Sequence, residues 1–201
     1  MLRTLLLILI SLAVVVPIWL VLADVDVAGL ESRPDPVGSY SAARAYIEGV
    51  ESEETDDLRS ECRTVFLDHG RKTGKAVVYF HGLTSCPEQF RALGEQIYDR
   101  GYNVWIVRLP HHGLEDPLNT EQADLDAEEL TALTDRVIDV GTALGDTLIV
   151  VGLSTGGVMA AWAAQYRSDV DRTVIIAPCF AIQPFNKDTT PWLASTALSI
   201  P

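Results

Sequence analysis

A serine between two glycines is the residue of this chain best placed to do covalent chemistry. Ser154 stands in the pentapeptide Gly152-Leu153-Ser154-Thr155-Gly156, after a run of apolar residues and before a stretch of small ones. A strand-turn-helix unit of this kind, the GxSxG nucleophile elbow, exposes a serine hydroxyl only if the flanking residues have very small side chains or none. The pattern therefore predicts a nucleophile at the amino end of a helix, where free N–H groups can hold a developing oxyanion.

The pentapeptide alone is a weak signal, because glycine and serine are common enough for it to arise by chance. The alternative is a Gly-Ser turn between a buried strand and a buried helix, with no chemical role. Two neighbouring segments favour the nucleophile: four of the five residues 148–152 are apolar or β-favouring, and residues 158–164 are almost wholly apolar and compatible with a helix.

Apolar runs and periodic segments alternate along the chain and predict its fold class. Residues 121–144 form the clearest amphipathic helix, because their leucines and valines recur at intervals of three and four. Expected strands cover residues 63–67, 76–80, 102–109, 148–152 and 173–177, and expected helices cover residues 87–100, 121–144 and 158–164. This alternation predicts an α/β protein with a doubly wound, mostly parallel sheet.

The charge of the chain argues against some partners. Its 201 residues, enough for one domain with a sizeable core, include 15 basic and 28 acidic side chains, which gives a net charge of -13. An acidic surface of this size disfavours nucleic acid and anionic membrane surfaces. We therefore expect no nucleic-acid partner.

The N-terminal segment predicts a membrane anchor. Residues 5–23 form an uncharged apolar run, whose length of about 19 residues approaches the hydrocarbon thickness of a bilayer. We expect residues 1–23 to be an uncleaved signal anchor, with a signal peptide cleaved after Ala23 as the alternative. The charges around this run place the rest of the chain outside the cytoplasm, held at the membrane or secreted. Residues 24–61, rich in Pro, Gly, Ser and acidic side chains, are interpreted as an acidic tether with a short helix around residues 42–50.

Two further motifs place histidines directly after expected strands. His81 and Gly82 follow one strand, and the adjacent pair His111 and His112 follows the next strand along the chain. Three roles are open for the pair: a structural role in the loop, a substitute base, or metal binding. A metal site needs further ligands at suitable positions, and none is evident.

The order of these three motifs resembles the α/β-hydrolase superfamily, and most closely its carboxylesterase and monoacylglycerol-lipase-like branch. The resemblance implies that Ser154 is the nucleophile and that the backbone N–H groups of Leu83 and Thr155 form the oxyanion hole. It also implies that Gly82 lets the loop approach the substrate carbonyl, and that His81 orders this loop and is not the catalytic base.

The resemblance covers about residues 63–179, and the chain departs from the family beyond them. The family places an acid and then a histidine after the nucleophile, whereas no histidine follows Ser154 in this sequence. The sheet is expected to end after the strand that would be the family's sixth. We therefore expect the front part of a longer hydrolase, with residues 62–201 as a partial domain and residues 178–201 as the start of a lid or a tail.

The resemblance also implies a disulfide. The family's second strand is antiparallel to its neighbours, so Cys62 at its start lies on the edge where the third strand ends and the loop carrying Cys86 begins. We expect these two cysteines to be joined in an oxidising compartment. Cys179 is expected to be a small buried side chain.

Together these features predict a serine hydrolase that cleaves carboxylic esters through an acyl-enzyme on Ser154. The expected substrate is a small or lipid-like ester, and no metal or other cofactor is expected. A non-catalytic binding module or pseudoenzyme is the alternative, because the chain lacks the acid and the histidine of the triad. Peptidase or thioesterase chemistry on the same serine is a further hypothesis that the sequence leaves open.

Overall fold

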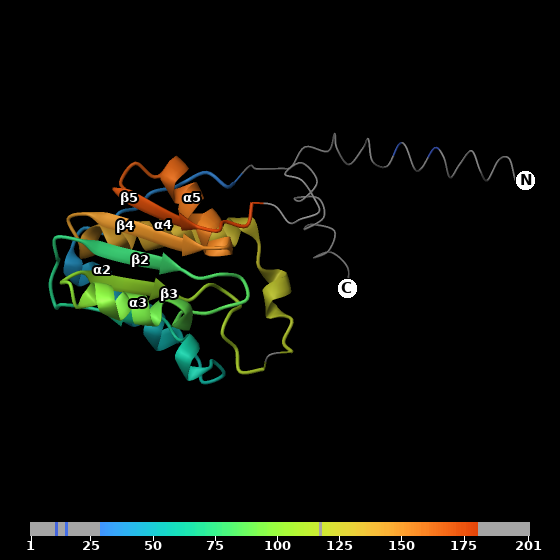
Figure 1. Ribbon diagram of the computed structural model, residues 1–201, viewed down its shortest axis with the longest axis horizontal. Coiled ribbons are helices and arrows are strands. Elements are labelled where there is room, and N and C mark those ends of the chain that lie inside the picture. The colour runs from blue at the N-terminus through green and yellow to red at the C-terminus, as the bar shows by residue number, and fades with distance from the viewer. Residues whose placement is uncertain (1–10, 12–14, 16–28, 117, 181–201) are drawn as a thin grey trace, which may run out of the picture. The chain divides into compact units, whose positions relative to one another are not determined.

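A sheet of five strands lies at the centre of the described part of the chain (Figure 1). The computed structural model describes residues 11, 15, 29–116 and 118–180. The strands are β1 (Val65–Leu67), β2 (Ala76–Phe80), β3 (Asn103–Val107), β4 (Leu148–Leu153) and β5 (Arg172–Ile176). Their order in the sheet is β1-β3-β2-β4-β5, in which β1 is antiparallel to β3 and the other pairs are parallel. The predicted α/β fold with a mostly parallel sheet is therefore confirmed.

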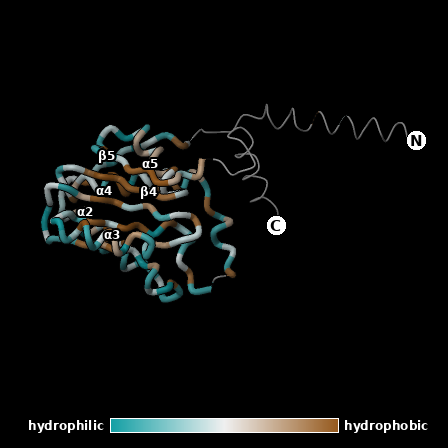
Figure 2. The backbone as a smooth tube through the Cα atoms, in the orientation of Figure 1, coloured by the Kyte–Doolittle hydropathy of each residue, from teal (hydrophilic) through white to brown (hydrophobic). Residues whose placement is uncertain are grey.

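The helices cover both faces of this sheet. They are α2 (Tyr40–Glu53), α3 (Glu88–Tyr98), α4 (Ala127–Leu144) and α5 (Thr155–Tyr166). Alternate side chains of β2 point to opposite faces, so that Ala76, Val78 and Phe80 join a core with α2, α4 and α5. Val77 and Tyr79 join a second core with α3. The apolar colour in Figure 2 accordingly gathers along the strands between the two helical layers.

The predicted helix over residues 121–144 is two elements in the structure. A 3-10 turn covers Glu121–Asp124, and α4 begins only after Asp126. The Asp126 side chain accepts a hydrogen bond from the N–H of Glu129 at 2.7 Å and thereby caps the helix. The predicted start was wrong because this capping aspartate, and not the spacing of the apolar residues, sets the first turn.

The acidic segment before β1 is part of the folded domain. Residues 29–61 belong to the same compact unit as the sheet. Within them α2 packs against α4, and its side chains Ala43 and Ile47 have no exposed surface. A spacing of four places this apolar pair on one helix face, while the acidic side chains face solvent. The prediction of a tether over residues 24–61 is therefore wrong for the described part of that range, although the short helix expected within it is present.

A buried arginine fastens this segment to the helices. The Arg167 guanidinium donates hydrogen bonds to the carboxylates of Asp135 at 2.8 Å and Asp139 at 2.6 Å. The Asp135 carboxylate also accepts a hydrogen bond from the Ser32 hydroxyl at 2.6 Å. Burial by itself lowers the pKa of the guanidinium, but its hydrogen bonds to Asp169, Asp135 and Asp139 outweigh burial and raise that pKa above its ordinary value. We call residues 29–37, which these bonds hold against α4, the N-terminal strap.

The predicted anchor or signal peptide over residues 1–23 lies outside the described residues, apart from Ser11 and Val15. No helix in the described part of the chain is both long enough and apolar enough to cross a membrane. The predicted lid or tail likewise lies outside the described residues from residue 181 onward.

Candidate active site

The predicted nucleophile lies in a strained turn between β4 and α5. Ser154 has φ 57° and ψ -116°, a conformation that residues other than glycine seldom adopt. It immediately precedes α5, and its side chain makes no capping hydrogen bond to the described helix. Backbone strain of this kind costs about 1–3 kcal/mol and persists only where the surrounding structure enforces it. The turn therefore keeps the hydroxyl out of the helix, at the carboxyl edge of the sheet.

Two glycines let this turn pack backbone against backbone. A Cβ atom on Gly152 would overlap the carbonyl oxygen of Gly156, and one on Gly156 would overlap the carbonyl oxygen of Phe80 at the end of β2. The N–H of Gly156 also donates to the carbonyl oxygen of His81 at 3.2 Å. The first turn of α5 therefore lies directly on the end of β2, which brings Ser154 beside the loop that follows this strand.

The loop after β2 carries one of the two predicted oxyanion donors. A Cβ atom built on Gly82 would lie 3.4 Å from the Cβ of Ser154, so the peptide between Gly82 and Leu83 borders the serine. Among the described residues, no acceptor pairs with the N–H of Leu83 or with that of Thr155. Two amide donors beside a serine hydroxyl can stabilise negative charge that develops on a carbonyl oxygen.

His81 orders this loop through both of its ring nitrogens. Its Nε2 accepts a hydrogen bond from the N–H of Leu109 at 3.1 Å, so Nδ1 carries the proton and donates to the carbonyl oxygen of Gly82 at 2.9 Å. Because the Gly82 carbonyl and the Leu83 N–H belong to one planar peptide, this bond sets the direction of the Leu83 N–H. Burial lowers the pKa of His81 to about 4, which keeps the ring neutral near pH 7. With both nitrogens engaged, His81 is not available as a base.

The other two motif histidines have different surroundings. His112 is fully buried, and its Nε2 and Nδ1 lie 2.7 Å from the carbonyl oxygen of Leu83 and 2.6 Å from that of Pro110. His111 is partly exposed, and its Nε2 lies 3.1 Å from a carboxylate oxygen of Glu129. Of the three roles considered for this pair, His112 has the surroundings of a loop-supporting side chain. In the described part of the chain, no group of His, Cys, Asp and Glu could hold a metal ion.

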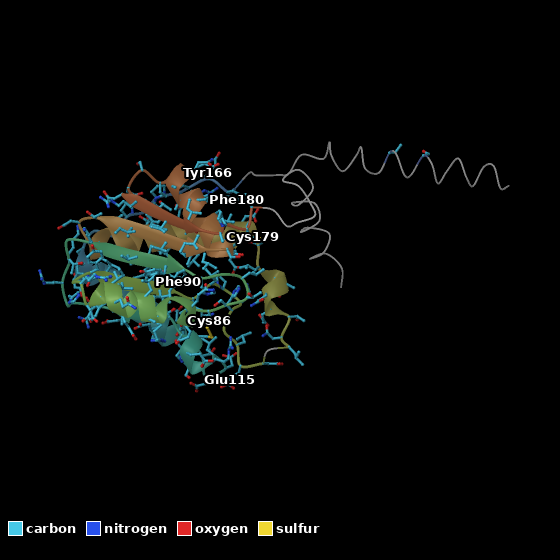
Figure 3. The ribbon with its side chains drawn as sticks, in the orientation of Figure 1. Cys86, Phe90, Glu115, Tyr166, Cys179 and Phe180 are labelled. Atoms are coloured by element: carbon cyan, nitrogen blue, oxygen red, sulfur yellow. A yellow bond between two sulfur atoms is a disulfide. The ribbon has the colours of Figure 1, made fainter. Side chains whose placement is uncertain are left out.

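A disulfide ties the far end of the same loop to the segment before β1. Cys62 and Cys86 are bonded, with Cα atoms 5.1 Å apart, and they are the pair that the resemblance implied (Figure 3). Both cysteines are buried. Cys179 is free and exposed, so the expectation of a buried side chain was wrong. It follows the outermost described strand, β5, and does not lie within the sheet.

Two cavities of different polarity border the site. One, of about 260 Å³, touches the loop after β2 and includes polar side chains such as Arg59, Ser85 and Gln122 in its wall. The other, of about 310 Å³, touches Thr155 and is lined mainly by apolar side chains of α4 and α5. The structure therefore offers a polar cavity at the loop after β2 and an apolar cavity at the start of α5.

One residue of the site gave no signal in the sequence. Gln89 lies in the first turn of α3, and its side-chain oxygen accepts a hydrogen bond from the N–H of Gly82 at 2.9 Å. A polar residue near the start of a helix is ordinary, so only the folded arrangement reveals that it holds the loop beside Ser154.

A mostly parallel sheet with a strained serine between β4 and α5 defines the chain as an α/β-hydrolase. Residues 71–200, which are 130 of its 201 residues, match the family described as serine aminopeptidase, S33. The chain belongs to this family. The resemblance to the esterase-like branch of the α/β-hydrolases is thereby confirmed.

A curated relative and two solved structures show the same likeness. The chain is 32% identical over 100 residues to the thermostable monoacylglycerol lipase of Bacillus sp. (strain H-257), and the match covers 47% of this chain and 36% of the lipase. It is similar in fold to a structure from work on the metagenome-derived lipolytic enzymes LipS and LipT, with a TM-score of 0.52 and 24% identity over 64% of this chain and 55% of that chain. It is also similar to Est1E from Butyrivibrio proteoclasticus with ferulic acid bound, with a TM-score of 0.50 and 18% identity over 67% of this chain and 52% of that chain. The chain thus spans about a third to a half of the length of these proteins.

Replacing Gly156 by alanine should disrupt the serine turn. Because the added Cβ overlaps the Phe80 carbonyl, the backbone must move, and we expect the free energy of unfolding to fall by more than about 2 kcal/mol in a urea titration. Gly49→Ala is the matched control, since its added Cβ meets open space within α2. That change should raise the free energy of unfolding by about 0.5–1 kcal/mol. Equal stabilities of the two variants would contradict the close packing described for the turn.

Acidification should weaken the fold through His81. The unfolded chain protonates this ring near the ordinary histidine pKa of 6.5, whereas burial lowers the pKa in the folded protein to about 4. The unfolded state therefore binds the proton first as the pH falls, so this contribution to stability is complete above about pH 6.5 and is lost toward about pH 4. We expect a loss of up to about 3 kcal/mol between pH 7 and pH 4, measured by urea titration at each pH. His81→Gln removes the titrating group and should flatten the profile by this amount, and an unchanged slope would show that His81 does not cause it.

Proposed function

We propose that the protein is a serine hydrolase that cleaves carboxylic esters through an acyl-enzyme on Ser154. The single observation that carries this proposal is the strained backbone of Ser154, beside which lie the backbone N–H groups of Leu83 and Thr155. In the proposed reaction, the Ser154 hydroxyl oxygen attacks the ester carbonyl carbon, and the N–H groups of Leu83 and Thr155 stabilise the charge on the carbonyl oxygen. The intermediate then expels the alcohol, which takes up a proton, and water hydrolyses the acyl-serine.

The reaction needs a base that takes the proton from the serine hydroxyl. Both ring nitrogens of His81 are engaged in hydrogen bonds. Both ring nitrogens of His112 lie within hydrogen-bonding distance of backbone carbonyl oxygens. The resemblance assigns the base to a histidine that follows the nucleophile, and residues 155–201 contain none.

Relatives support an ester as the bond that is cleaved. The curated relative is named a monoacylglycerol lipase, and the two solved structures are described as a lipolytic enzyme and as Est1E with ferulic acid bound. The family itself is described as a serine aminopeptidase, so peptide hydrolysis on the same serine stays a competing reaction. The pairing of one apolar and one polar cavity suits an ester that has an apolar acyl group and a polar alcohol.

A non-catalytic binding module is the second candidate function. It is favoured by one observation: within the 201 residues, the two buried motif histidines are engaged in the loop, and no histidine follows the serine. Such a module would keep the fold and the cavities and would bind an ester or a related ligand without cleaving it.

Ser154→Ala should abolish ester hydrolysis. Removing the nucleophile should lower kcat/KM for p-nitrophenyl butyrate at least about 1,000-fold and should prevent labelling by a fluorophosphonate probe. Ser60→Ala makes the same chemical change at an exposed serine and should leave both readouts unaltered. Labelling that persists in the Ser154→Ala protein would refute the nucleophile, and a native protein that never labels would favour the binding module.

We also propose that the domain lies outside the cytoplasm, held by residues 1–23 or released from them. The apolar run in that segment supports this placement, as does the Cys62–Cys86 disulfide, because disulfides persist in oxidising compartments.

Cell fractionation should locate the domain at the outer side of the membrane. The protein that carries residues 1–23 should resist alkaline carbonate extraction, and protease that cannot cross the membrane should digest the domain when it is added outside intact, wall-free cells. A shortened protein that begins at Asp24 is the control and should remain inside the cell. Recovery of the native protein from the cytosol with free thiols at Cys62 and Cys86 would contradict the placement. Release with a new terminus after Ala23 would identify a cleaved signal peptide.

A further inference from the structure

The loop after β2 contains a glycine whose conformation decides where the N–H of Leu83 points. Gly82 borders the nucleophile, since a Cβ built on it would lie 3.4 Å from the Cβ of Ser154. Glycine rotates about its backbone bonds more freely than any other residue. Leu83 and Thr84 are exposed, so burial of their side chains does not restrain the loop. The loop therefore depends on bonds to its backbone for a single conformation.

Hydrogen bonds hold both polar groups of Gly82. Its carbonyl oxygen accepts from Nδ1 of His81 at 2.9 Å and from the N–H of Ser85 at 3.1 Å. Its N–H donates to the side-chain oxygen of Gln89 at 2.9 Å. The first two bonds fix the peptide that leads to Leu83, and the bond to Gln89 fixes the peptide before it. Because the rotation at Gly82 relates these two peptide planes, the direction of the Leu83 N–H depends on both.

Two helices hold the peptide before Gly82 from opposite sides. The N–H of Gly156 in α5 donates to the carbonyl oxygen of His81 at 3.2 Å, while Gln89 of α3 accepts from the N–H of Gly82. The carbonyl and the N–H of one planar trans peptide point in opposite directions, so the two bonds together stop the peptide from turning. Without the Gln89 oxygen, the buried N–H of Gly82 would need a new partner, and the peptide would keep only the bond to α5.

Gln89 lies on a rigid part of the structure. A Cβ added to Gly94, further along α3, would lie 2.9 Å from a side-chain carbon of β3, so the helix lies closely against the sheet. Cys86 and Phe90, which flank Gln89, are both buried and are labelled in Figure 3. Cys86 forms the disulfide, and the Phe90 ring packs on that of Tyr79 with centroids 4.8 Å apart. An acceptor on such an element holds its donor more precisely than one on a loop.

From these contacts we infer that Gln89 is a positioning residue for the proposed reaction. Its amide oxygen fixes Gly82 and thereby keeps the Leu83 N–H beside Ser154, although Gln89 itself does not touch the reacting atoms. This inference rests on the proposed function for its effect on turnover, whereas the hold on Gly82 exists without any reaction. An oxyanion donor acts mainly in the transition state, so a misdirected donor lowers kcat and leaves KM nearly unchanged.

The first test measures exchange of the Gly82 amide hydrogen by NMR in the 15N-labelled protein. Gln89→Met removes the acceptor, keeps the length of the side chain, and should speed this exchange about tenfold. Gln96→Met is the matched control, because it makes the same change at an exposed glutamine of α3 and should leave the rate unaltered. Gln89→Glu retains an acceptor oxygen and should keep the native rate. Equal rates in the native and Gln89→Met proteins would overturn the inference.

The second test measures kcat and KM for p-nitrophenyl butyrate. Gln89→Met should lower kcat at least about tenfold and leave KM within about twofold, whereas Gln96→Met should change neither. Thermal unfolding of both variants shows whether the fold is intact. If Gln89→Met is unfolded, Gln89→Asn replaces it in both tests, because its shorter side chain cannot reach Gly82. Faster exchange at Gly82 with an unchanged kcat would overturn the role of Gln89 in the reaction.

The two proposals fail in distinguishable ways. Ester turnover that survives Ser154→Ala, together with faster exchange in Gln89→Met, would remove the nucleophile and leave the hold on Gly82. Turnover that depends on Ser154, with no change in exchange or kcat in Gln89→Met, would leave the proposed function and remove the positioning role. If the native protein hydrolyses no ester, the exchange rate alone decides: faster exchange in Gln89→Met supports the hold on Gly82, and an unchanged rate overturns it.

Discussion

The close approach of α5 to the end of β2 is the contact on which the site depends. Side chains normally keep helix and strand backbones apart, but the absence of a Cβ on Gly156 lets its backbone lie against the carbonyl oxygen of Phe80. This contact holds the turn at Ser154, which has a positive φ, beside the loop that follows β2. The strain at Ser154 is therefore maintained by the pairing of β2 with β4, since every residue of β2 has a partner in β4.

Hydrogen bonds from polar side chains then determine how the loop after β2 presents its backbone. The loop follows a fully buried strand, and its carbonyl groups need donors that the sheet no longer supplies. His81 and His112 face two successive carbonyl groups of this loop, those of Gly82 and Leu83. Their burial is thus explained by the backbone that they support, and neither ring needs a part in proton transfer.

The sequence was sufficient to predict the sheet, because each strand is a nearly continuous apolar run. It was also sufficient to predict the turn at Ser154, because only glycine fits on both sides of this serine. It was misleading for residues 29–61, where composition suggested a solvated tether. A pair of apolar side chains, Ala43 and Ile47, is too small a signal to outweigh many acidic residues in composition, yet it is buried against α4. The contacts of Gln89 and Asp135 could not be predicted either, because each joins segments whose proximity exists only after folding.

The charged cluster around Arg167 explains how an acidic segment can form part of the wall of the apolar cavity between α4 and α5. Burying an arginine and its aspartate partners removes them from water, and such a cluster is seldom a net source of stability. Its effect here is positional, because the carboxylates of Asp135 and Asp139 also accept hydrogen bonds from the strap and so fix its register on α4. That register places Leu30 beside Trp162, and Leu30 in turn forms part of the wall of this cavity. Part of the large acidic excess of this chain is therefore buried, where it determines the shape of a cavity near the serine.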